Sequence, residues 1–273
     1  MSLLERTKVL LRRYRISPNK FMGQNFMIEP SLFHNLSEYA SLGQNDVTLD
    51  VGAGLGFLTR FLASRCKRVL AVEADNSLVK ALHAELADLL NIEIIKGNVL
   101  KIQVSKFNKV VSIPPYQISS RLLGWLFNRG FDLAVLIFQK EFAKRLVAPV
   151  GSEDYGWLTL LTYYYVDCEL LDEVPKSLFY PQPEVGSIII RLSSKQPKPF
   201  ALTDEVLFTK LAQSLFTQRN RKVRNAVLPF LKGIQGKTAE TAIKKADMLP
   251  FHDQRVRELA PEDFGVLANA ISN

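Results

Sequence analysis

Cysteine, histidine and tryptophan are scarce in this chain of 273 residues, which has two cysteines, three histidines and two tryptophans. Cys66 and Cys168 lie far apart and form no C-x-x-C pair, so the sequence indicates neither a disulfide framework nor a zinc site. The histidines His34, His83 and His252 are isolated from one another, which is typical of solvated or core histidines. We therefore expect no metal centre.

Long apolar runs are also missing. No run of about 18 uncharged apolar residues occurs, so we expect no membrane span. The N-terminal LLERTKVLLRRYR is interrupted by charge and lacks the apolar core of a signal peptide, so we expect a cytoplasmic protein. Acidic residues are the minority charge, since 35 Lys and Arg against 27 Asp and Glu give a net charge of +8. A basic balance favours a polyanionic partner.

The most informative stretch is VTLDVGAGLG, from Val47 to Gly56. It predicts a buried strand that runs into a glycine turn and then a helix, an arrangement that binds nucleotides at the carboxyl end of a strand. The next apolar run ends in Glu73, where an acid can hold ribose hydroxyls. The spacing is G-x-G-x-G rather than the dinucleotide G-x-G-x-x-G, which resembles the S-adenosylmethionine (SAM) loop of methyltransferases. A glycine turn without a ligand remains the alternative.

A second stretch, Ile113-Pro114-Pro115-Tyr116, follows another predicted strand. Methylation of an exocyclic amine is difficult because the nitrogen lone pair is delocalised into the ring. Two acceptor oxygens that take its N–H bonds, with an aromatic face to hold the base, would favour the reaction. Proline stiffens such a turn and removes a competing N–H group. The alternative is a rigid loop with a packed tyrosine.

Along the chain, helical and strand patterns alternate, which predicts a parallel, doubly wound sheet. We expect strands over 47–51, 69–72, 92–95, 109–112 and 133–138, and two further strands over 163–174 and 186–192 that could form a hairpin at the sheet edge. The segment Lys195-Gln196-Pro197-Lys198-Pro199 is typical of a linker. We therefore predict one domain over 1–194, which includes an N-terminal basic helix, and a small helical domain over 195–273, whose first helix is capped by Thr203.

Basic residues gather in the N-terminal helix and in the segment after residue 218. Phosphate contact is the functional interpretation, and a solvated helix face is the alternative. The candidate RNA-binding residues are Lys8, Arg12, Arg13, Arg219, Arg221, Lys222 and Arg224.

An ordered set of motifs covers nearly the whole chain, from Asn19 to about Phe264: GQNFM, DVGAGLG, VEAD, KVVSIPPYQISS, QKEFAKRL, PKSLFYPQPEVGS and FTQRNRKVRNAV. Together they resemble the ribosomal RNA adenine dimethyltransferases, and most of all their archaeal and eukaryotic branch. The resemblance implies a Rossmann-like class I SAM methyltransferase with a mostly parallel seven-stranded sheet and a small C-terminal all-α domain.

The resemblance also implies the activity. The expected reaction is direct methyl transfer from SAM to adenine N6, twice on each of two neighbouring adenines. The expected substrate is a hairpin loop near the 3′ end of small-subunit rRNA, within a pre-30S-type particle, and the expected protein is a monomer that acts late in small-subunit biogenesis. No metal is implied, because the sulfonium supplies the leaving group.

Site residues follow from the matched motifs. Those implied to contact SAM are Gln24, Asn25, Met27, Gly52, Gly54, Glu73 and Asn98. Those implied at the target base are Ile113, Pro114 and Tyr116, with Tyr116 stacked on the flipped adenine.

Two positions depart from the family pattern. Asn98 stands where the family has an aspartate that reads the adenine amine of SAM, which should weaken binding by about 1 kcal/mol. Ile113 stands where the family has an asparagine that accepts a bond from the target amine, which leaves the main-chain oxygen of Pro114 as the one acceptor. A one-residue shift would put Ser112 in that role. Loss of the bond predicts a rate roughly tenfold to a hundredfold lower.

These departures keep a second class of function open, an RNA-binding assembly factor that has the fold but little or no turnover. A methyltransferase for DNA or a small molecule is a third interpretation, which the basic helical domain disfavours.

Overall fold

The computed structural model describes residues 1–19, 22–235 and 239–272. Residues 236–238 and 273 of the predicted C-terminal domain lie outside the described residues. So do Lys20 and Phe21, which lie shortly before the GQNFM motif. The chain divides into two compact units. The first contains residues 1–143 and 168–194, and the second contains residues 144–167 and 195–273.

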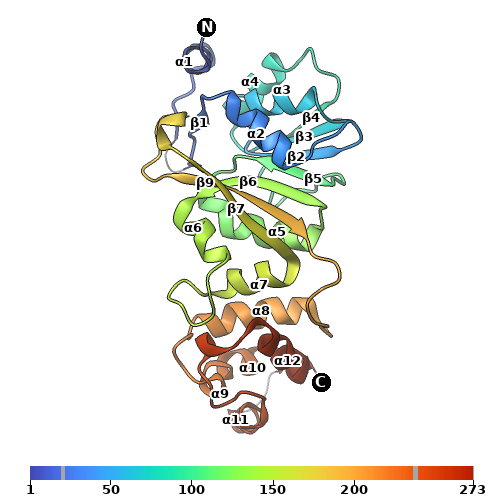
Figure 1. Cartoon of the computed structure of the whole chain (residues 1–273), viewed down its shortest axis with the longest axis vertical. Helices are drawn as coiled ribbons and strands as arrows, with labels where there is room; N and C mark the ends of the chain where they lie inside the picture. Colours follow the sequence, from blue (N-terminus) through green and yellow to red (C-terminus); the bar gives the residue numbers. More distant parts are fainter. Residues whose placement is uncertain (20–21, 236–238, 273) are drawn as a thin grey trace. The chain divides into compact units, whose positions relative to one another are not determined.

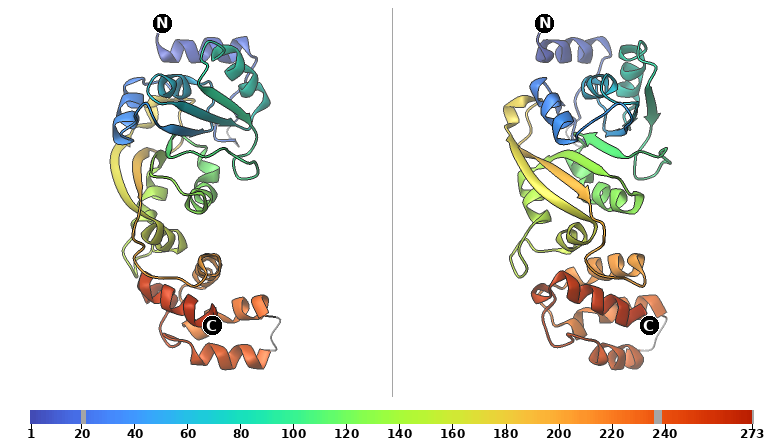
Figure 2. Two further views of the ribbon diagram at one scale, coloured as in Figure 1. Left: turned by 90° about the vertical axis from the view of Figure 1, so that its right-hand side faces the viewer. Right: turned by 45° about the vertical axis from the view of Figure 1, so that its right-hand side comes forward.

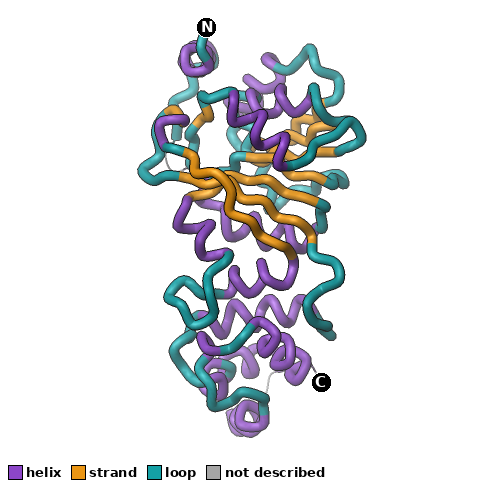
Figure 3. Tube along the Cα trace, viewed as in Figure 1, coloured by secondary structure: helices purple, strands orange, loops and turns teal. Residues whose placement is uncertain are grey.

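A seven-stranded sheet forms the centre of the first unit (Figures 1 and 3). Its strands are β2 (Val47–Val51), β3 (Arg68–Glu73), β4 (Ile92–Lys96), β5 (Lys109–Ser112), β6 (Leu133–Gln139), β7 (Val166–Val174) and β9 (Ser187–Ser194). The strand order is β4-β3-β2-β5-β6-β9-β7. The first five run parallel and β9 pairs antiparallel with β6. The predicted mostly parallel, Rossmann-like sheet is confirmed.

Helices cover both faces of this sheet. They are α2 (Ser31–Tyr39), α3 (Phe57–Ala63), α4 (Asn76–Glu85), α5 (Ser119–Arg129) and α6 (Lys140–Leu146), which runs from the first unit into the second. A further helix, α1 (Leu3–Arg13), does not lie on the sheet (Figure 1). Side chains of α2 and α3, such as Leu36 and Leu62, pack with Val111 and Val135 of the sheet. Helix α5 lies on the opposite face (Figure 1). The carboxyl ends of β2, β3 and β5 therefore open at one edge, where a ligand site is expected.

A two-stranded ladder tethers the N-terminal segment to the first unit. Strand β1 (Phe26–Met27) pairs antiparallel with β8 (Phe179–Tyr180), so the segment before β1 lies beside the loop after β8. Helix α1 packs against α4 through Leu10, Leu11 and Leu78. Figure 2 shows these two helices side by side.

The second unit is helical. Its helices are α7 (Trp157–Tyr165), α8 (Glu205–Phe216), α9 (Val223–Ala226), α10 (Leu228–Gln235), α11 (Ala239–Met248) and α12 (Pro261–Ser272), with a short 3-10 turn, η4 (Val256–Glu258). Tyr164, Phe200 and Phe208 pack ring against ring in its core. The predicted cap of α8 was one residue early, because the Asp204 carboxylate, not Thr203, accepts the N–H groups of Val206 and Leu207.

The strand predicted over residues 163–174 was wrong at its start. Residues 163–165 belong to α7, and β7 begins at Val166. The sequence WLTLLTYYY is apolar on all sides, so periodicity could not distinguish a buried helix from a buried strand. Residues 144–167, which the sequence assigned to the first domain, group with the helical unit, since α7 packs against α8 and α12.

No helix in the described parts of the chain is long and apolar enough to cross a membrane.

Candidate active site

The glycine turn after β2 faces the carboxylate at the end of β3. Gly52, Gly54 and Gly56 all have positive φ values, of 78°, 58° and 80°. The N–H of Gly54 donates to Glu73 Oε2 at 2.9 Å, and the N–H groups of Ala74 and Asp75 donate to Oε1 at 2.7 and 2.9 Å. Glu73 is 7% exposed, and burial raises the pKa of its carboxyl against the opposing effect of these backbone bonds.

The double-proline corner after β5 contacts the glycine turn directly. A Cβ atom added to Gly52 would lie 2.7 Å from Cδ of Pro115, so only glycine allows this approach. Ser112, the last residue of β5, accepts the N–H of Val51 at 2.9 Å and donates its hydroxyl to the carbonyl of Val51 at 2.7 Å. The Ser112 side chain is fully buried and bonded to both backbone groups of Val51, which argues against the register shift that would make it the acceptor for a target amine.

A cavity of about 260 Å³ opens beside this contact. Its lining includes Gly52, Glu73, Asn98, Pro115 and Arg121. The Asn98 side chain is exposed, and its Oδ1 accepts the N–H of Leu100 at 3.0 Å. A carboxylate and an amide oxygen therefore face one cavity, where they can accept hydrogen bonds from a diol and from an amine.

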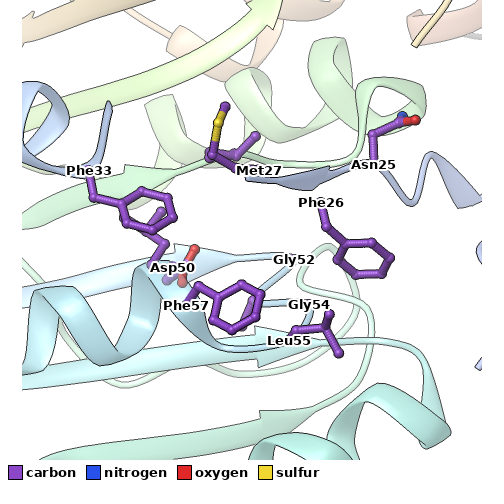
Figure 4. Close-up of a pocket in the computed structure, with 12 residues that line it drawn as sticks. Asn25, Phe26, Met27, Phe33, Asp50, Gly52, Gly54, Leu55 and Phe57 are labelled. Atoms are coloured by element: carbon purple, nitrogen blue, oxygen red, sulfur yellow. The ribbon is translucent and has the colours of Figure 1, made fainter. Parts of the chain in front are cut away.

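A second, narrower cavity of about 50 Å³ also has Gly52 in its lining (Figure 4). Its lining includes Asn25, Met27, Gly54 and Ile113, together with Phe26, Phe33 and Phe57. The cavity also receives Asp50, which is 1% exposed and whose Oδ2 accepts the hydroxyl of Thr59 at 2.7 Å.

Asp50 was missed as a site residue. Burial raises the pKa of its carboxyl to about 7, and the nearby Glu73 charge acts in the same direction. The signal was present in the sequence, since Asp50 directly precedes the glycine turn. The same sequence pattern also fits a strand whose polar face is exposed to solvent. The burial of Asp50 could therefore not be predicted from the sequence.

The GQN loop closes the side of the site. Gln24 Oε1 accepts the N–H of Asn19 at 2.8 Å, and Gln24 Nε2 donates to Asp75 Oδ2 at 3.2 Å. Because Asp75 caps α4, two residues after Glu73, Gln24 joins the loop to the acidic end of β3. A Cβ atom on Gly23, with φ of 64°, would lie 2.2 Å from Oε1 of Gln117, so the loop also lies against the proline corner.

Tyr116 borders a third cavity, of about 310 Å³. The lining contains Gly23, Asn25, Tyr116, Gln117, Gln139 and the segment Pro181, Gln182, Pro183 and Glu184. The Tyr116 hydroxyl hydrogen-bonds with Ser187 Oγ at 2.5 Å, and burial raises the pKa of the phenol. Pro114 is buried and Ile113 is partly buried among apolar side chains. Gln139, Gln182 and Glu184 are polar groups at this cavity that the sequence interpretation did not single out.

The residues present fit SAM on the chemistry of their side chains. The larger cavity beside Gly52 presents the Glu73 carboxylate to a ribose and the Asn98 amide to an adenine. The narrower one presents the Asp50 carboxylate to a cationic amino-acid end. Asn25, Met27, Gly52, Gly54, Glu73 and Asn98 all line one or the other cavity, whereas Gln24 positions the loop.

The basic candidates differ in their surroundings. Lys8, Arg12 and Arg13 are all exposed on α1, and Arg13 lies 3.2 Å from Glu85. In the second unit, Arg219 donates to the carbonyls of Ser152 and Glu153.

Asp253 lies beside two further candidates, Lys222 at 2.8 Å and Arg224 at 3.2 Å, and the Lys222 hydrogen bond is the main cause of its lowered pKa. Arg221 is exposed. Arg255 and Arg257 are exposed on a neighbouring segment, which an isolated antiparallel β-bridge between Lys222 and Arg255 joins to the segment after residue 218. The sequence did not single out these two arginines.

Within residues 1–19, 22–235 and 239–272, no cluster of three or more His, Cys, Asp or Glu side chains could hold a metal ion.

Known proteins resemble this chain over nearly its whole length. Residues 16–256 match the family model described as ribosomal RNA adenine dimethylase. A probable ribosomal RNA small subunit methyltransferase A of Methanosarcina mazei is 39% identical over 270 residues, which cover 96% of each chain. Its counterpart of the same name in Methanopyrus kandleri is 36% identical and covers 100% of this chain and 99% of its own.

Two solved structures resemble the fold. A dimethyladenosine transferase from Plasmodium falciparum superimposes with a TM-score of 0.73 at 24% identity, over 89% of this chain and 95% of that one. The 23S rRNA methyltransferase ErmE superimposes with a TM-score of 0.63 at 26% identity, over 91% of this chain and 100% of that one.

Proposed function

Because the chain belongs to the ribosomal RNA adenine dimethylase family, we propose that it dimethylates N6 of two adjacent adenosines in the hairpin loop near the 3′ end of small-subunit rRNA. The chain is a SAM-dependent rRNA adenine dimethyltransferase. The choice of small-subunit rRNA is supported by relatives named small subunit methyltransferase A. We further propose that it acts as a cytoplasmic monomer on a late, pre-30S-type particle.

One observation carries the proposal: the glycine turn and the double-proline corner touch at Gly52 and Pro115. A methyl group at the first and an amine at the second would then be in reach of each other. Bound SAM would supply the methyl group: the amine nitrogen bonds to the methyl carbon as the carbon–sulfur bond breaks, the sulfur leaves as a neutral thioether, and the amine gives up one proton to water. The chain contributes positioning, which is a large part of the rate gain when two reactants are held in line.

Each side chain has a proposed task. Glu73 accepts the ribose hydroxyls, and Asn98 accepts the adenine amine through the free lone pair of an oxygen already bonded to Leu100. Tyr116 supports the flipped target base, because enzymes that modify a base take it out of the stack. The main-chain oxygen of Pro114 accepts one N–H of the target amine. Ile113 offers no acceptor for the second.

The direct test is to map modified adenines. Immature small subunits that lack the modification are incubated with the protein and isotopically labelled SAM, and the 3′-terminal rRNA fragment is analysed by mass spectrometry. We expect two methyl groups on each of two neighbouring adenosines. Label at other bases, or no label when the protein is folded and binds SAM, would rule out the proposed reaction.

A second candidate is favoured by one specific residue. Ile113, which lines the narrow cavity, cannot accept a hydrogen bond, so an assembly factor with little turnover remains the alternative function. It would bind the immature particle as tightly as an active enzyme but leave its adenosines largely unmodified. The same mapping experiment, read together with particle binding, separates the two functions.

A further inference from the structure

We infer that a basic groove between α1 and Tyr180 binds the single-stranded RNA next to the flipped adenine. The groove has a volume of about 580 Å³ and is lined by Lys8, Leu11, Arg12, Arg15, Ile16, Ser17, Pro18 and Tyr180. The inference deepens the proposed function and rests on it, since it assigns the path of the RNA strand outside the target cavity. Three cations and an aromatic face in one groove are the combination that proteins use for single strands.

The positive charges of α1 fall into two groups. Arg6 and Arg13 lie 3.6 and 3.2 Å from Glu85, whose side chain is 14% exposed, so these two cations share one carboxylate partner within the fold. Lys8, Arg12 and Arg15 are exposed and, among the residues that the structure describes, make no ion pair. The groove therefore collects the uncompensated cations of this helix and its C-terminal turn, which is what a phosphate backbone requires.

Arg15 lines the groove in a backbone conformation that is unfavourable for residues other than glycine. Its φ is 53°, in the left-handed region. The N–H of Ile16 bonds to the carbonyl of Leu11, and that of Arg15 bonds to the carbonyl of Arg12, which is the helix-ending pattern that normally places glycine at the Arg15 position. A long cation at a position suited to glycine indicates a role for the side chain, because such strain persists mainly at functional sites.

The groove also adjoins the proposed target cavity. Tyr180 pairs with Phe26 in the β1–β8 ladder, and Lys8 Nζ lies 5.3 Å from the centre of the Tyr180 ring. The next residue, Pro181, lines the cavity that contains Tyr116. An RNA strand leaving the target cavity thus meets the aromatic ring first and the three cations beyond it. Duplex RNA offers no unpaired base to such a ring.

The test compares two variants with the same change in net charge. Arg12→Gln/Arg15→Gln removes two groove cations, whereas Arg6→Gln/Arg68→Gln removes two cations that are paired with Glu85 and Glu93. Binding of a fluorescent hairpin RNA with an unpaired loop is measured by anisotropy between low and moderate salt. We expect the groove variant to lose about tenfold in affinity and to lower the salt slope by about 1.4, since each single-strand contact contributes about 0.7. Equal losses in both variants, or none in the groove variant, would overturn the inference.

A second variant separates binding from folding. Arg15→Gly relieves the strained turn, so we expect its melting temperature to rise by about 2 °C while its RNA affinity falls. A rise in melting temperature with unchanged RNA affinity would refute a role for Arg15. If the parent protein methylates immature small subunits and the groove variant does so equally well at low particle concentration, only the groove assignment fails. If the parent binds SAM but leaves the adenosines of immature small subunits unmodified, the proposed function fails with it.

Discussion

Gly52 and Pro115 are 63 positions apart in the sequence, yet a single added methyl group on Gly52 would be placed 2.7 Å from the Pro115 ring. This contact joins the ends of β2 and β5, which are neighbours in the sheet. The two most informative motifs of the sequence therefore form one site. The close approach also explains why the turn needs glycine there, since φ at Gly52 is 78°.

Replacing Gly52 with alanine should damage the site at its centre. Alanine is strained in the left-handed backbone conformation, and its Cβ atom would clash with the Pro115 ring. We therefore expect a loss of about 1–3 kcal/mol in unfolding free energy. SAM affinity, measured by calorimetry, should fall by about tenfold or more because the turn and the corner move apart. Gly124→Ala is the matched control. Gly124 lies inside α5 with no atom near its added Cβ, and this change should stabilise the fold by about 0.5–1 kcal/mol. An unchanged SAM affinity in Gly52→Ala would contradict the proposed cofactor site.

Asp50 should make stability depend on pH in an unusual direction. Its pKa is raised to about 7 in the folded chain, well above the ordinary value of an aspartate, so between these two values the folded state holds a proton that the unfolded state has released. The contribution of protonated Asp50 to the unfolding free energy is therefore fully present below about pH 4 and is lost as the pH rises through about 7. The difference between a pKa of about 7 and the ordinary aspartate value corresponds to roughly 4 kcal/mol, as an upper bound.

Asp50→Asn removes this titration and keeps an oxygen for the Thr59 hydroxyl. We expect the variant to be more stable than the parent at pH 8 by about 2–4 kcal/mol, and the difference to shrink at pH 5. Urea unfolding at the two pH values measures both numbers. Burial also raises the pKa of Glu73, so the stability of both proteins depends on pH through that residue. The effect of Asp50 is therefore the difference in unfolding free energy between variant and parent at each pH. A difference that does not change with pH would show that Asp50 is ionised throughout.

The sequence predicted those elements whose cause is local. Strand β5 was expected over residues 109–112 and is observed there, because the apolar run of Val110 and Val111 ends at the proline corner. The N-terminal basic helix was expected and is observed as α1, from Leu3 to Arg13. Helix α7 was missed because its apolar residues face buried surroundings on nearly every side, so its pattern has no polar face.

Features of the site that depend on distant residues could not be predicted in this way. The ion pair of Arg13 with Glu85 spans 72 positions, and nothing near Arg13 in the sequence distinguishes it from Arg12. The burial of Asp50 depends on Thr59 and on the strand that carries Ser112. The motif resemblance supplied candidate residues, and the structure adds which of them share a cavity.

Asn98 offers a test of cofactor affinity. In Asn98→Asp the carboxylate can keep the hydrogen bond from the Leu100 N–H and would accept the adenine amine as a charge-assisted bond. We expect the dissociation constant for SAM to fall by about fivefold, equivalent to about 1 kcal/mol. Asn98→Ala should raise it by a similar factor. Equilibrium dialysis with labelled SAM gives both values. If all three proteins bind SAM equally, Asn98 does not contact the cofactor.

Ile113 provides the sharpest distinction between a slow enzyme and a binding factor. Ile113 lines the narrow cavity assigned to the amino-acid end of SAM and does not line the Tyr116 cavity. We predict that an asparagine oxygen at this position still reaches the second N–H of a target amine that approaches the methyl group. A bond made mainly in the transition state is worth about 1–3 kcal/mol, so Ile113→Asn should raise the single-turnover rate by roughly tenfold to a hundredfold. Ile113→Val is the control, since it shortens the side chain without adding an acceptor, and its rate should stay within about twofold of the parent.

The size of the effect identifies the function of the parent. A modest gain over a measurable parent rate supports an active dimethyltransferase that tolerates isoleucine. A large gain over a silent parent, with particle binding equal in both, supports the assembly factor. Ile113 packs beside the apolar cluster of α2 and α3, so a melting curve of each variant is recorded to show that the assays are run on folded protein. No change in rate for folded Ile113→Asn would mean that this position does not face the target amine.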